Sequence, residues 1–574
     1  MSGIYGLYSK KQLNIKKNIF RFFYSSNFEN VLNEEYQYEN FIFGRSVIPK
    51  FLNDRIIHED EEFIIGFEGI IFNKETKNSF DSIKAWYQQK NIKFVEDIQG
   101  QFCGFIYDKK INKLFIYNDH LSTKPLYFYH DNEIFIFASE LKVVTKLLYE
   151  LKITKELDYD AIYCMLTFGY MLGNTTYEKN TKKLQYATIF EIDKFFNSRE
   201  IKYFEYTKNE NFNLSKQEII DTIDTLLSNS VKNYWSKDEE YGYSHYAFLS
   251  GGLDSRVNLF LAKEQGYQDV LTMTFSQSKS SDDIISQNIS TKEYFKHIFY
   301  SLDNGRYLEQ NLEKYVNAND GLVNLQGSAG GFSFLSAINH KNYGLLHTGQ
   351  IGDVLFCSFV KKNFKVQQGI MSDQKDLLKD ISFLDRIMAK YDNNPEIFSF
   401  EQRQQNSTLN GDRTYANYVD VASPFYNRDL IEFCLTIPNK YKKNEAIYID
   451  WFNAKHKNIA NFIWESAGVK PRNINIIKIA KKIKRYKNAI LRRLGFNIND
   501  MNPFDIWLRN NDKILTNLNN IFSHHIDNVK DKKLKNILVS MYNADIQYGH
   551  YGRNNKFLVV TLLLALVLHF GDDN

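Results

Sequence analysis

The sequence predicts a chain of mixed α/β class, in which an antiparallel β region precedes a parallel α/β region with a helical end. Three observations predict this. Residues before about 205 form short β-like segments between clusters of Asp, Asn and Lys. After about residue 210, apolar strands alternate with segments of helical spacing, which is typical of βαβ units. From about residue 370 onward, the spacing of apolar residues is mostly helical.

The antiparallel region is clearest in three segments. Residues 61–73, 101–119 and 126–139 alternate or run apolar, and turn-forming residues separate them. Neighbouring β segments joined by such short turns are typical of antiparallel hairpins.

The parallel region begins with a predicted helix over residues 216–235, where apolar residues recur every three or four positions. Four short apolar strands follow, at residues 246–250, 269–275, 297–302 and 344–349. Because helical segments separate these strands, we expect them to form one parallel sheet.

Length and composition limit the class of protein. A chain of 574 residues exceeds a single ordinary core, and we place a domain boundary between residues 1–208 and 209–574. The apolar fraction of 43% and charged fraction of 24% are typical of a soluble globular protein. The net charge of +4 gives no indication of a nucleic-acid partner.

The two ends of the sequence give information on the cellular compartment of the protein. The first residues lack the charged start and apolar core of a secretory signal. The apolar run 557–570 is shorter than the ~20 residues that span a bilayer, so we expect a buried helix and no transmembrane segment. We expect a cytoplasmic protein with buried free thiols, because its cysteines are scattered. These are Cys103, Cys164, Cys357 and Cys434.

The hexapeptide SGGLDS, residues 250–255, lies between a predicted strand that ends at Leu249 and a predicted helix. Its adjacent glycines let an anion approach the backbone, and the helix presents free N–H groups to that anion. Ser250 and Ser255 add hydroxyl donors. Asp254 would repel phosphate oxygens unless a divalent cation lies between them. The loop therefore predicts a site for a Mg²⁺-bound polyphosphate.

The hexapeptide resembles the SGGxDS signature of the PP-loop ATP-pyrophosphatases, which cleave ATP between the α- and β-phosphates and activate a carboxylate as an adenylate. The resemblance implies ATP and Mg²⁺ as cofactors and catalytic roles for Asp254 and Ser255. It also implies nucleotide contacts by residues of the loop and of the next strand. These are Leu249, Ser250, Gly251, Gly252, Asp254, Ser255 and Thr274.

A second segment, residues 345–356, resembles the SGxGxDExF segment of asparagine synthetases. The resemblance implies nucleotide contacts by Thr348 and Gly349 and a second magnesium ligand in Asp353. Two positions depart from the pattern, since Ile351 displaces the second glycine and Val354 replaces the following acidic residue.

Residues 100–144 and 422–442 also resemble segments of the asparagine synthetase-like family. That family joins an N-terminal Ntn-hydrolase-like glutaminase domain, an αββα sandwich, to a PP-loop synthetase domain of the adenine nucleotide alpha hydrolase-like fold. The resemblance therefore implies an ATP-dependent C–N ligase.

The glutaminase pocket departs from the family pattern. Ser2 stands where the family has its nucleophilic cysteine, Glu68 replaces the oxyanion-hole Asn, and Ile70 replaces the Glu that binds the substrate amine. Asp119 matches the family's RD aspartate, and Arg45 is a candidate for its carboxylate-binding arginine. We predict a degenerate domain. The alternative is a serine-dependent amidohydrolase with another substrate.

The expected reaction therefore joins a small-molecule or peptide carboxylate to ammonia or a substrate amine. Lys470 is a candidate for the family's catalytic lysine, and a homodimer is a candidate assembly. Residues 470–493 are rich in Lys and Arg and contain no acidic residue, which fits a solvated helix, an anionic substrate, RNA or an anionic membrane. The alternatives are a PP-loop RNA-modifying enzyme and a non-catalytic partner subunit.

Overall fold

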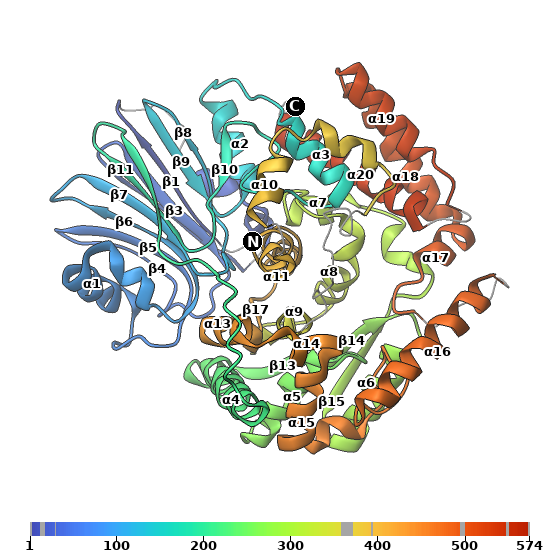
Figure 1. Cartoon of the computed structure of the whole chain (residues 1–574). Helices are drawn as coiled ribbons and strands as arrows, with labels where there is room; N and C mark the ends of the chain where they lie inside the picture. The colour runs from blue at the N-terminus through green and yellow to red at the C-terminus, as the bar shows by residue number, and fades with distance from the viewer. Residues whose placement is uncertain are drawn as a thin grey trace.

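Figure 1 shows the computed structural model of the chain, which places two β sheets beside a large helical and parallel α/β region. The structure describes residues 3–11, 18–28, 30–356, 371–391, 394–493, 500–546 and 550–571. Ser2 and Cys357, which the sequence analysis singled out, lie outside the described residues. Cys103, Cys164 and Cys434 are buried free thiols, as predicted.

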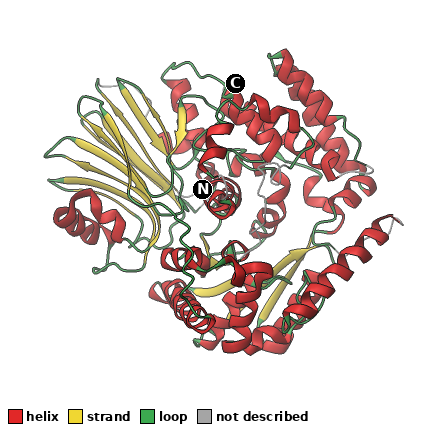
Figure 2. Ribbon diagram, in the orientation of Figure 1, coloured by secondary structure: helices red, strands yellow, loops and turns green. Residues whose placement is uncertain are grey.

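The N-terminal region contains two six-stranded antiparallel sheets that face each other (Figure 2). The first has the order β10 (Thr181–Lys183), β8 (Tyr127–His130), β9 (Ile134–Ala138), β1 (Gly3–Ser9), β3 (Phe41–Val47) and β2 (Leu32–Tyr38). The second has the order β12 (Ser198–Lys202), β11 (Thr188–Asp193), β7 (Lys113–Asn118), β6 (Gly100–Asp108), β5 (Phe63–Ile71) and β4 (Ile56–Glu59). The three predicted β segments are therefore confirmed as β5, the β6–β7 hairpin and the β8–β9 hairpin.

Aromatic residues fill the space between these sheets. Phe41, Phe105, Phe137 and Phe190 alternate with outward-facing neighbours on their strands and belong to one buried cluster. On the outer side of the second sheet, α1 (Ser79–Lys90) packs against β5. Helix α2 (Leu141–Glu150) packs against β9 and β8, and α3 (Tyr159–Phe168) belongs to the same cluster. The region is an Ntn-like sandwich, as predicted.

The second region contains a five-stranded sheet whose adjacent strands are all parallel. Its order is β15 (Lys296–Ser301), β14 (Val270–Ser276), β13 (Ser244–Phe248), β16 (Tyr343–His347) and β17 (Val421–Ala422). The four predicted strands are confirmed. The predicted helix is α4 (Lys216–Glu240), which begins at a capping box of Ser215 and Glu218.

Helices connect these strands and form most of the rest of the chain. They are α5 (Asp254–Glu264), α6 (Ser281–Glu293), α7 (Glu313–Ala318), α8 (Ala329–Leu335), α9 (Gly352–Leu355), α10 (Leu384–Lys390), α11 (Pro395–Phe398), α12 (Leu409–Arg413), α13 (Arg428–Thr436), α14 (Asn439–Lys442), α15 (Ala446–Lys455), α16 (Ile474–Arg493), α17 (Phe504–Asn510), α18 (Asp512–His525), α19 (Lys532–Tyr542) and α20 (His550–Phe570).

Helix α20 contains the apolar run near the end of the sequence. Within the described chain, Gly552–Phe570 is the one helical segment that is long and apolar enough to cross a bilayer, and 67% of its apolar window is buried. It packs against α18 and α19 and against α2 and α3 of the N-terminal region. The buried helix that the sequence predicts is therefore present.

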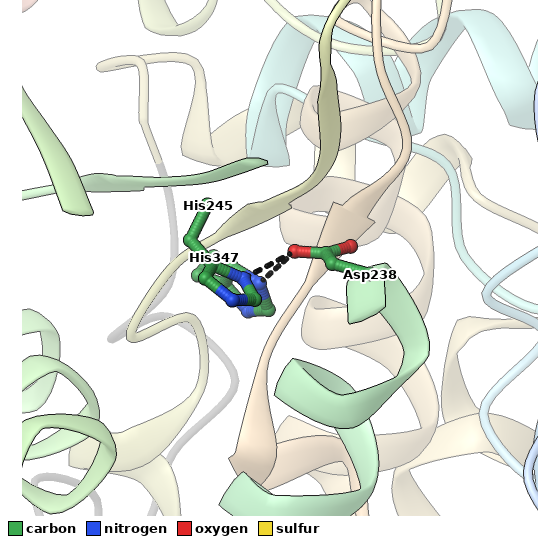
Figure 3. A group of neighbouring side chains, drawn as sticks. All are labelled: Asp238, His245 and His347. Atoms are coloured by element: carbon green, nitrogen blue, oxygen red, sulfur yellow. Dashed lines mark hydrogen bonds and ion pairs between the residues drawn. The ribbon is translucent and has the colours of Figure 1, made fainter. Parts of the chain in front are cut away.

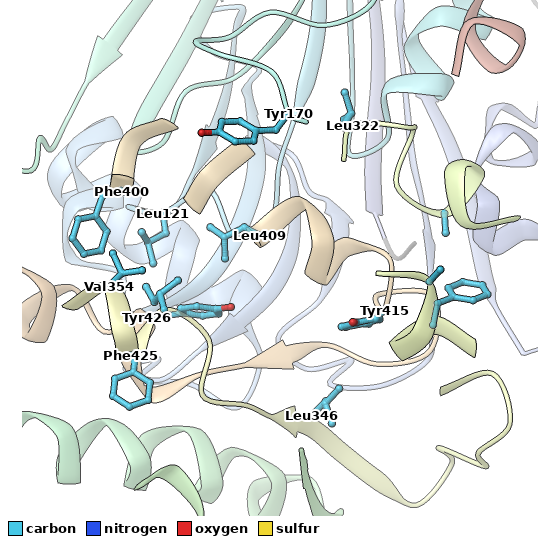
Figure 4. Close-up of a cluster of buried hydrophobic side chains, with 14 of the residues drawn as sticks. Leu121, Tyr170, Leu322, Leu346, Val354, Phe400, Leu409, Tyr415, Phe425 and Tyr426 are labelled. Carbon is cyan, nitrogen blue, oxygen red and sulfur yellow. The ribbon is translucent and has the colours of Figure 1, made fainter. Parts of the chain in front are cut away.

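Buried side chains from both regions meet in a shared cluster. Figure 4 shows Leu121 and Tyr170, from before the predicted boundary, in the same cluster as Val354, Leu409 and Phe425. The boundary predicted between residues 208 and 209 falls in the connection from β12 to α4. The shared core means that the two regions contact each other over apolar surface, and the exact division stays a prediction.

Candidate nucleotide site

The loop that carries SGGLDS follows the carboxyl end of β13 and leads into α5. The Ser250 N–H donates a hydrogen bond to Ser255 Oγ at 3.2 Å, and the Gly252 N–H donates to Ser250 Oγ at 3.1 Å. The two hydroxyl oxygens lie 3.0 Å apart. The serines therefore hold the loop in a tight turn at the edge of the parallel sheet, where open α/β sheets bind their ligands.

Gly251 is fixed by contacts on both sides of its peptide. Its N–H donates to Asp282 Oδ1 at 2.9 Å, and its carbonyl accepts a hydrogen bond from the Glu465 N–H at 2.9 Å. A Cβ at this position would lie 2.7 Å from Glu465 Cβ, so only glycine fits without movement. Behind the loop, the buried Arg256 guanidinium donates to the carbonyls of Gly251 and Ile463.

The second predicted segment packs directly against this loop. A Cβ at Gly349 would lie 2.3 Å from the Asp254 carbonyl carbon, and one at Gly352 would lie 2.7 Å from Asp254 Oδ1. Between them, Ile351 has a φ of +60°, a left-handed conformation that is strained for a β-branched residue. The close approach explains the two glycines, and it brings Asp353 next to Asp254.

Asp254 and Asp353 form a pair of neighbouring carboxyl groups. The pKa of Asp254 is raised well above its ordinary value, mainly by burial and next by the negative charge of Asp353. Asp353 itself is exposed. Oxygen ligands held together in this way match the preference of Mg²⁺ for carboxylates and phosphates, so the donor set fits the predicted metal.

The loop opens into a cavity of about 340 Å³. Among the described residues that line it, two are aspartates and none is Lys, Arg or His. A polyphosphate bound here would therefore depend on backbone amides, hydroxyls and a metal cation for its charge balance. The lining residues are Phe248, Leu249, Ser250, Gly252, Asp254, Ser255, Met273, Thr274, Phe275, Asp282, Thr348, Gly349, Gln350, Tyr415 and Met501.

Strand contacts place the other predicted nucleotide residues at this cavity. The Leu249 N–H donates to the Met273 carbonyl at 2.9 Å, and the Thr274 hydroxyl donates to the Leu249 carbonyl. The Thr348 N–H donates to the Ala422 carbonyl at 2.8 Å, which links β16 to β17. All of these hydrogen bonds lie at the carboxyl ends of adjacent strands.

Comparisons with known proteins agree with this geometry. A family model for the glutamine amidotransferase domain matches residues 56–204, and one for asparagine synthase matches residues 222–374. The chain belongs to the asparagine synthase family. Its N-terminal region is thus amidotransferase-like, and the parallel region that holds the cavity is the asparagine synthase domain.

Three relatives illustrate the extent of the similarity. A Methanocaldococcus jannaschii protein with a provisional asparagine synthetase name is 31% identical over 37% of this chain and 43% of its own length. Asparagine synthetase [glutamine-hydrolyzing] 2 of Bacillus subtilis is 27% identical over 51% of this chain and 40% of its own. A second M. jannaschii protein is 23% identical over 78% of this chain and 76% of its own length. The match spans less than half the length of the first two relatives.

Several cavity residues were not predicted from the sequence of this asparagine synthase-family chain. Asp282 comes from the start of α6, Gln350 follows the predicted Gly349, and Tyr415 follows α12. Gln350 Nε2 donates to Asp412 Oδ1 at 3.0 Å, and the Tyr426 hydroxyl donates to Asp412 Oδ2 at 2.6 Å. Burial raises the pKa of Asp412 to about 7. Asp282, Asp412 and Tyr415 lie in no local motif, and Gln350 occupies an unspecified position of the second segment, so it is the fold that brings them together.

Lys470 is exposed and does not line the cavity, so its catalytic role stays a prediction. Lys484, on α16, forms an ion pair with Glu465 at 2.9 Å, and Glu465 contacts Gly251. Lys484 is therefore linked to the SGGLDS loop through a single intermediate residue.

A buried polar group supports strand β16, which leads to Thr348. Figure 3 shows His245 and His347 directed at one oxygen of Asp238, with distances of 3.0 and 2.8 Å to Oδ2. These three residues could also hold a metal ion by distance alone. The other carboxylate oxygen accepts from the Leu345 N–H at 2.8 Å. Both oxygens of the Asp238 carboxylate thus have hydrogen-bond partners, and these bonds fix β16 against α4.

In the amidotransferase-like region, Glu68 lies in a buried group of charges. Its carboxylate is 3.3 Å from Arg55 Nε and 3.8 Å from Lys124 Nζ. Arg55 and Lys124 also form ion pairs with Asp420, which belongs to the asparagine synthase region. Two cations and two carboxylates thus balance one another at the contact between the regions.

The other residues of the predicted glutaminase pocket are also engaged. Ile70 is buried, and Arg45 pairs with Glu34 and donates to the Arg55 carbonyl. The Asp119 carboxylate accepts hydrogen bonds from the N–H groups of Phe102 and Leu121. Asp119 therefore stabilises a turn, and Arg45 already has a carboxylate partner.

Proposed function

We propose that this chain is an ATP-dependent ligase that adenylates a substrate carboxylate, releases pyrophosphate, and forms an amide bond with ammonia or a substrate amine. The observation that carries the proposal is the contact between the SGGLDS loop and the Gly349–Gly352 segment. This contact joins an anion-binding turn to a pair of carboxyl groups, Asp254 and Asp353.

The chemistry follows from the placement of these groups. A carboxylate oxygen attacks the α-phosphorus, the bond to the β-phosphate oxygen breaks, and pyrophosphate leaves with that electron pair. The amine nitrogen then attacks the acyl carbon, a proton is lost from nitrogen, and AMP departs with the oxygen. In this proposal the Ser250 and Ser255 hydroxyls and the first N–H groups of α5 would meet the leaving pyrophosphate.

Asp254 and Asp353 would hold Mg²⁺ in this proposal. A bound Mg²⁺ supplies charge neutralisation at the phosphate oxygens. The chain's own residues keep the two carboxylates adjacent, because Gly349 and Gly352 allow the backbone of the second loop to touch Asp254. The strained Ile351 lies between these glycines, at the point where the second loop turns toward α9.

The nitrogen source is proposed to be ammonia or an amine on the substrate rather than glutamine. The buried ion pairs of Glu68 and the engagement of Arg45 by Glu34 support this proposal, because glutamine would need free groups for its own charges. We further propose a cytoplasmic enzyme with domains 1–208 and 209–574, in which the first domain is a scaffold.

Isotope labelling tests the reaction type. With a substrate that supports turnover and carries ¹⁸O in its carboxylate, we expect one labelled oxygen in AMP and none in pyrophosphate. The control reaction contains the same labelled substrate with a non-hydrolysable α,β-methylene analogue of ATP, which should give no labelled nucleotide. Formation of ADP and phosphate would contradict the proposal.

A further inference from the structure

Helix α16 carries a row of exposed apolar side chains on the face turned away from the molecule. Its members recur at intervals of three and four residues, so they lie along one side of the helix. Each is between 57 and 62% exposed. We call this row the apolar stripe. It consists of Ile476, Ile479, Ile483, Tyr486 and Ile490.

The opposite face of α16 holds the helix on the body of the protein. Ile477 is buried, Lys481 pairs with Glu445 at 2.8 Å and lies 4.0 Å above the Trp464 ring, and Lys484 pairs with Glu465. These contacts fix the rotation of the helix, so the apolar stripe faces outward. Figure 1 shows α16 at the rim of the molecule.

The charges of α16 are all of one sign. The helix contains no Asp or Glu. By helical spacing, Lys482 and Lys487 border the apolar stripe, one on each side, and Lys478 and Arg485 lie farther round the helix. Lys481 and Lys484 lie on the opposite face, in the ion pairs described above. An amphipathic helix with isoleucines on one face and only cations beside them has the pattern of a helix that lies in the surface of an anionic bilayer.

We propose that the apolar stripe docks on an anionic lipid bilayer, with α16 parallel to the membrane plane. The isoleucines and Tyr486 would enter the boundary between headgroups and acyl chains, and the flanking lysines would contact lipid phosphates. Eight charges in one helix exclude a membrane-spanning role.

The charge pattern disfavours the other occupants of such a surface. A second copy of α16 packed on the stripe would bring its own bordering lysines against Lys482 and Lys487, and like charges at such a contact repel. Nucleic acid phosphates would satisfy the lysines and leave the isoleucines exposed to water. An anionic bilayer satisfies both features together.

Vesicle flotation of the full chain tests this proposal. We expect binding to phosphatidylcholine vesicles that contain phosphatidylglycerol to be at least about tenfold stronger than to phosphatidylcholine alone, and to weaken with salt. The double variant Ile479→Ser, Ile483→Ser should lose at least about tenfold in binding to the anionic vesicles. Lys482→Gln with Lys487→Gln should lose most of the preference for anionic lipid.

A matched control is available on another surface. Phe195 and Phe212 are 65 and 69% exposed, so Phe195→Ser with Phe212→Ser removes as much exposed apolar surface elsewhere and should leave flotation unchanged. The melting temperature of every variant should stay within a few degrees of the wild type, because all substituted side chains are exposed.

Three results would overturn the proposal. The first is equal flotation of the wild type and the stripe variant. The second is a dimer, measured by analytical ultracentrifugation, that dissociates in the stripe variant. The third is RNA binding that depends on Lys482 and Lys487 and is unaffected by Ile479→Ser, Ile483→Ser.

Discussion

Buried carboxyl groups in the two regions of this chain have neighbours of opposite charge. Where the sequence predicts a degenerate glutaminase pocket, Glu68 and Asp420 are each paired with the cations Arg55 and Lys124. At the nucleotide cavity, Asp254 lies beside another carboxylate, and no cationic side chain is present among the described lining residues. In the first arrangement each carboxylate has cationic partners, and both oxygens of Glu68 are without a hydrogen bond from the described residues. In the second, the proposed metal would supply the positive charge that the described lining residues lack.

This difference separates a structural site from a binding site. Buried charges that are mutually neutralised give little reason to bind a further ion, and removing one of them leaves its partner uncompensated. A buried carboxyl group such as Asp254, whose pKa is raised by burial and by a neighbouring carboxylate at the end of a parallel sheet, is typical of a functional site. The following variants test the comparison in order of decreasing expected effect.

The largest effect is expected for Asp254→Asn, which removes one proposed metal ligand. We expect at least about a hundredfold loss of ATP-dependent pyrophosphate release, measured in saturating Mg²⁺, with little change in the melting temperature. Asp269→Asn is the matched control, because Asp269 is 80% exposed and forms a surface ion pair with Lys296. Unchanged pyrophosphate release in Asp254→Asn would remove the basis for the proposed site.

At the ion pairs around Glu68, we expect a substitution to lower the stability of the fold. Glu68→Gln leaves Arg55 and Lys124 with one carboxylate, and we expect the free energy of unfolding to fall by about 3–5 kcal/mol in denaturant titrations. Glu133→Gln, at the exposed pair with Lys11, should cost less than about 1 kcal/mol. The Glu68 variant should also release no glutamate from glutamine, and appearance of glutaminase activity would show that Glu68 blocks a competent pocket.

Asp412, beside the nucleotide cavity, is a buried carboxyl group that is held by hydrogen bonds from the neutral side chains of Gln350 and Tyr426. Its pKa is about 7 in the folded protein, against an ordinary value of 3.8, so the folded chain keeps a proton that the unfolded chain loses. Stability should therefore fall as pH rises from about 4 to about 7, by up to about 4 kcal/mol, and stay low above pH 7. Asp412→Asn should flatten this dependence in melting curves, and an equally steep curve in the variant would contradict the assignment.

The smallest effect is expected at the contact between the two nucleotide loops. Gly349→Ala places a Cβ 2.3 Å from the Asp254 backbone, and we expect a loss of about 1–3 kcal/mol in stability together with reduced pyrophosphate release. Gly411→Ala is the control, because a Cβ there meets no atom within 4 Å. Equal behaviour of the two variants would mean that the loops separate easily.

Much of the fold was predictable because it depends on local patterns. Alternating apolar residues gave the antiparallel strands, and the SGGLDS turn between strand and helix located the cavity. Strand β17 was missed, since two residues are too few to show a period. Asp282 was missed because it lies in no motif, and Gln350 was missed because it occupies a position that the pattern of the second segment leaves unspecified.

The charge arrangement could not be predicted in the same way. The sequence indicated that Glu68 replaces the oxyanion-hole Asn, but the cations Arg55 and Lys124 and the second carboxylate, Asp420, come from separate segments. Arg55 and Asp420 are 365 positions apart. Similarly, the basic character of α16 was visible in the sequence, whereas the outward direction of the apolar stripe depends on its contacts with Glu445 and Glu465.

Helix α20 has a consequence for the order in which the molecule assembles. Its His569 ring lies 3.2 Å from the Thr145 hydroxyl of α2, a contact between positions 424 residues apart. During synthesis, α2 and α3 therefore emerge from the ribosome long before the helix that covers them. The N-terminal region therefore completes this part of its apolar core only when the end of the chain has been made.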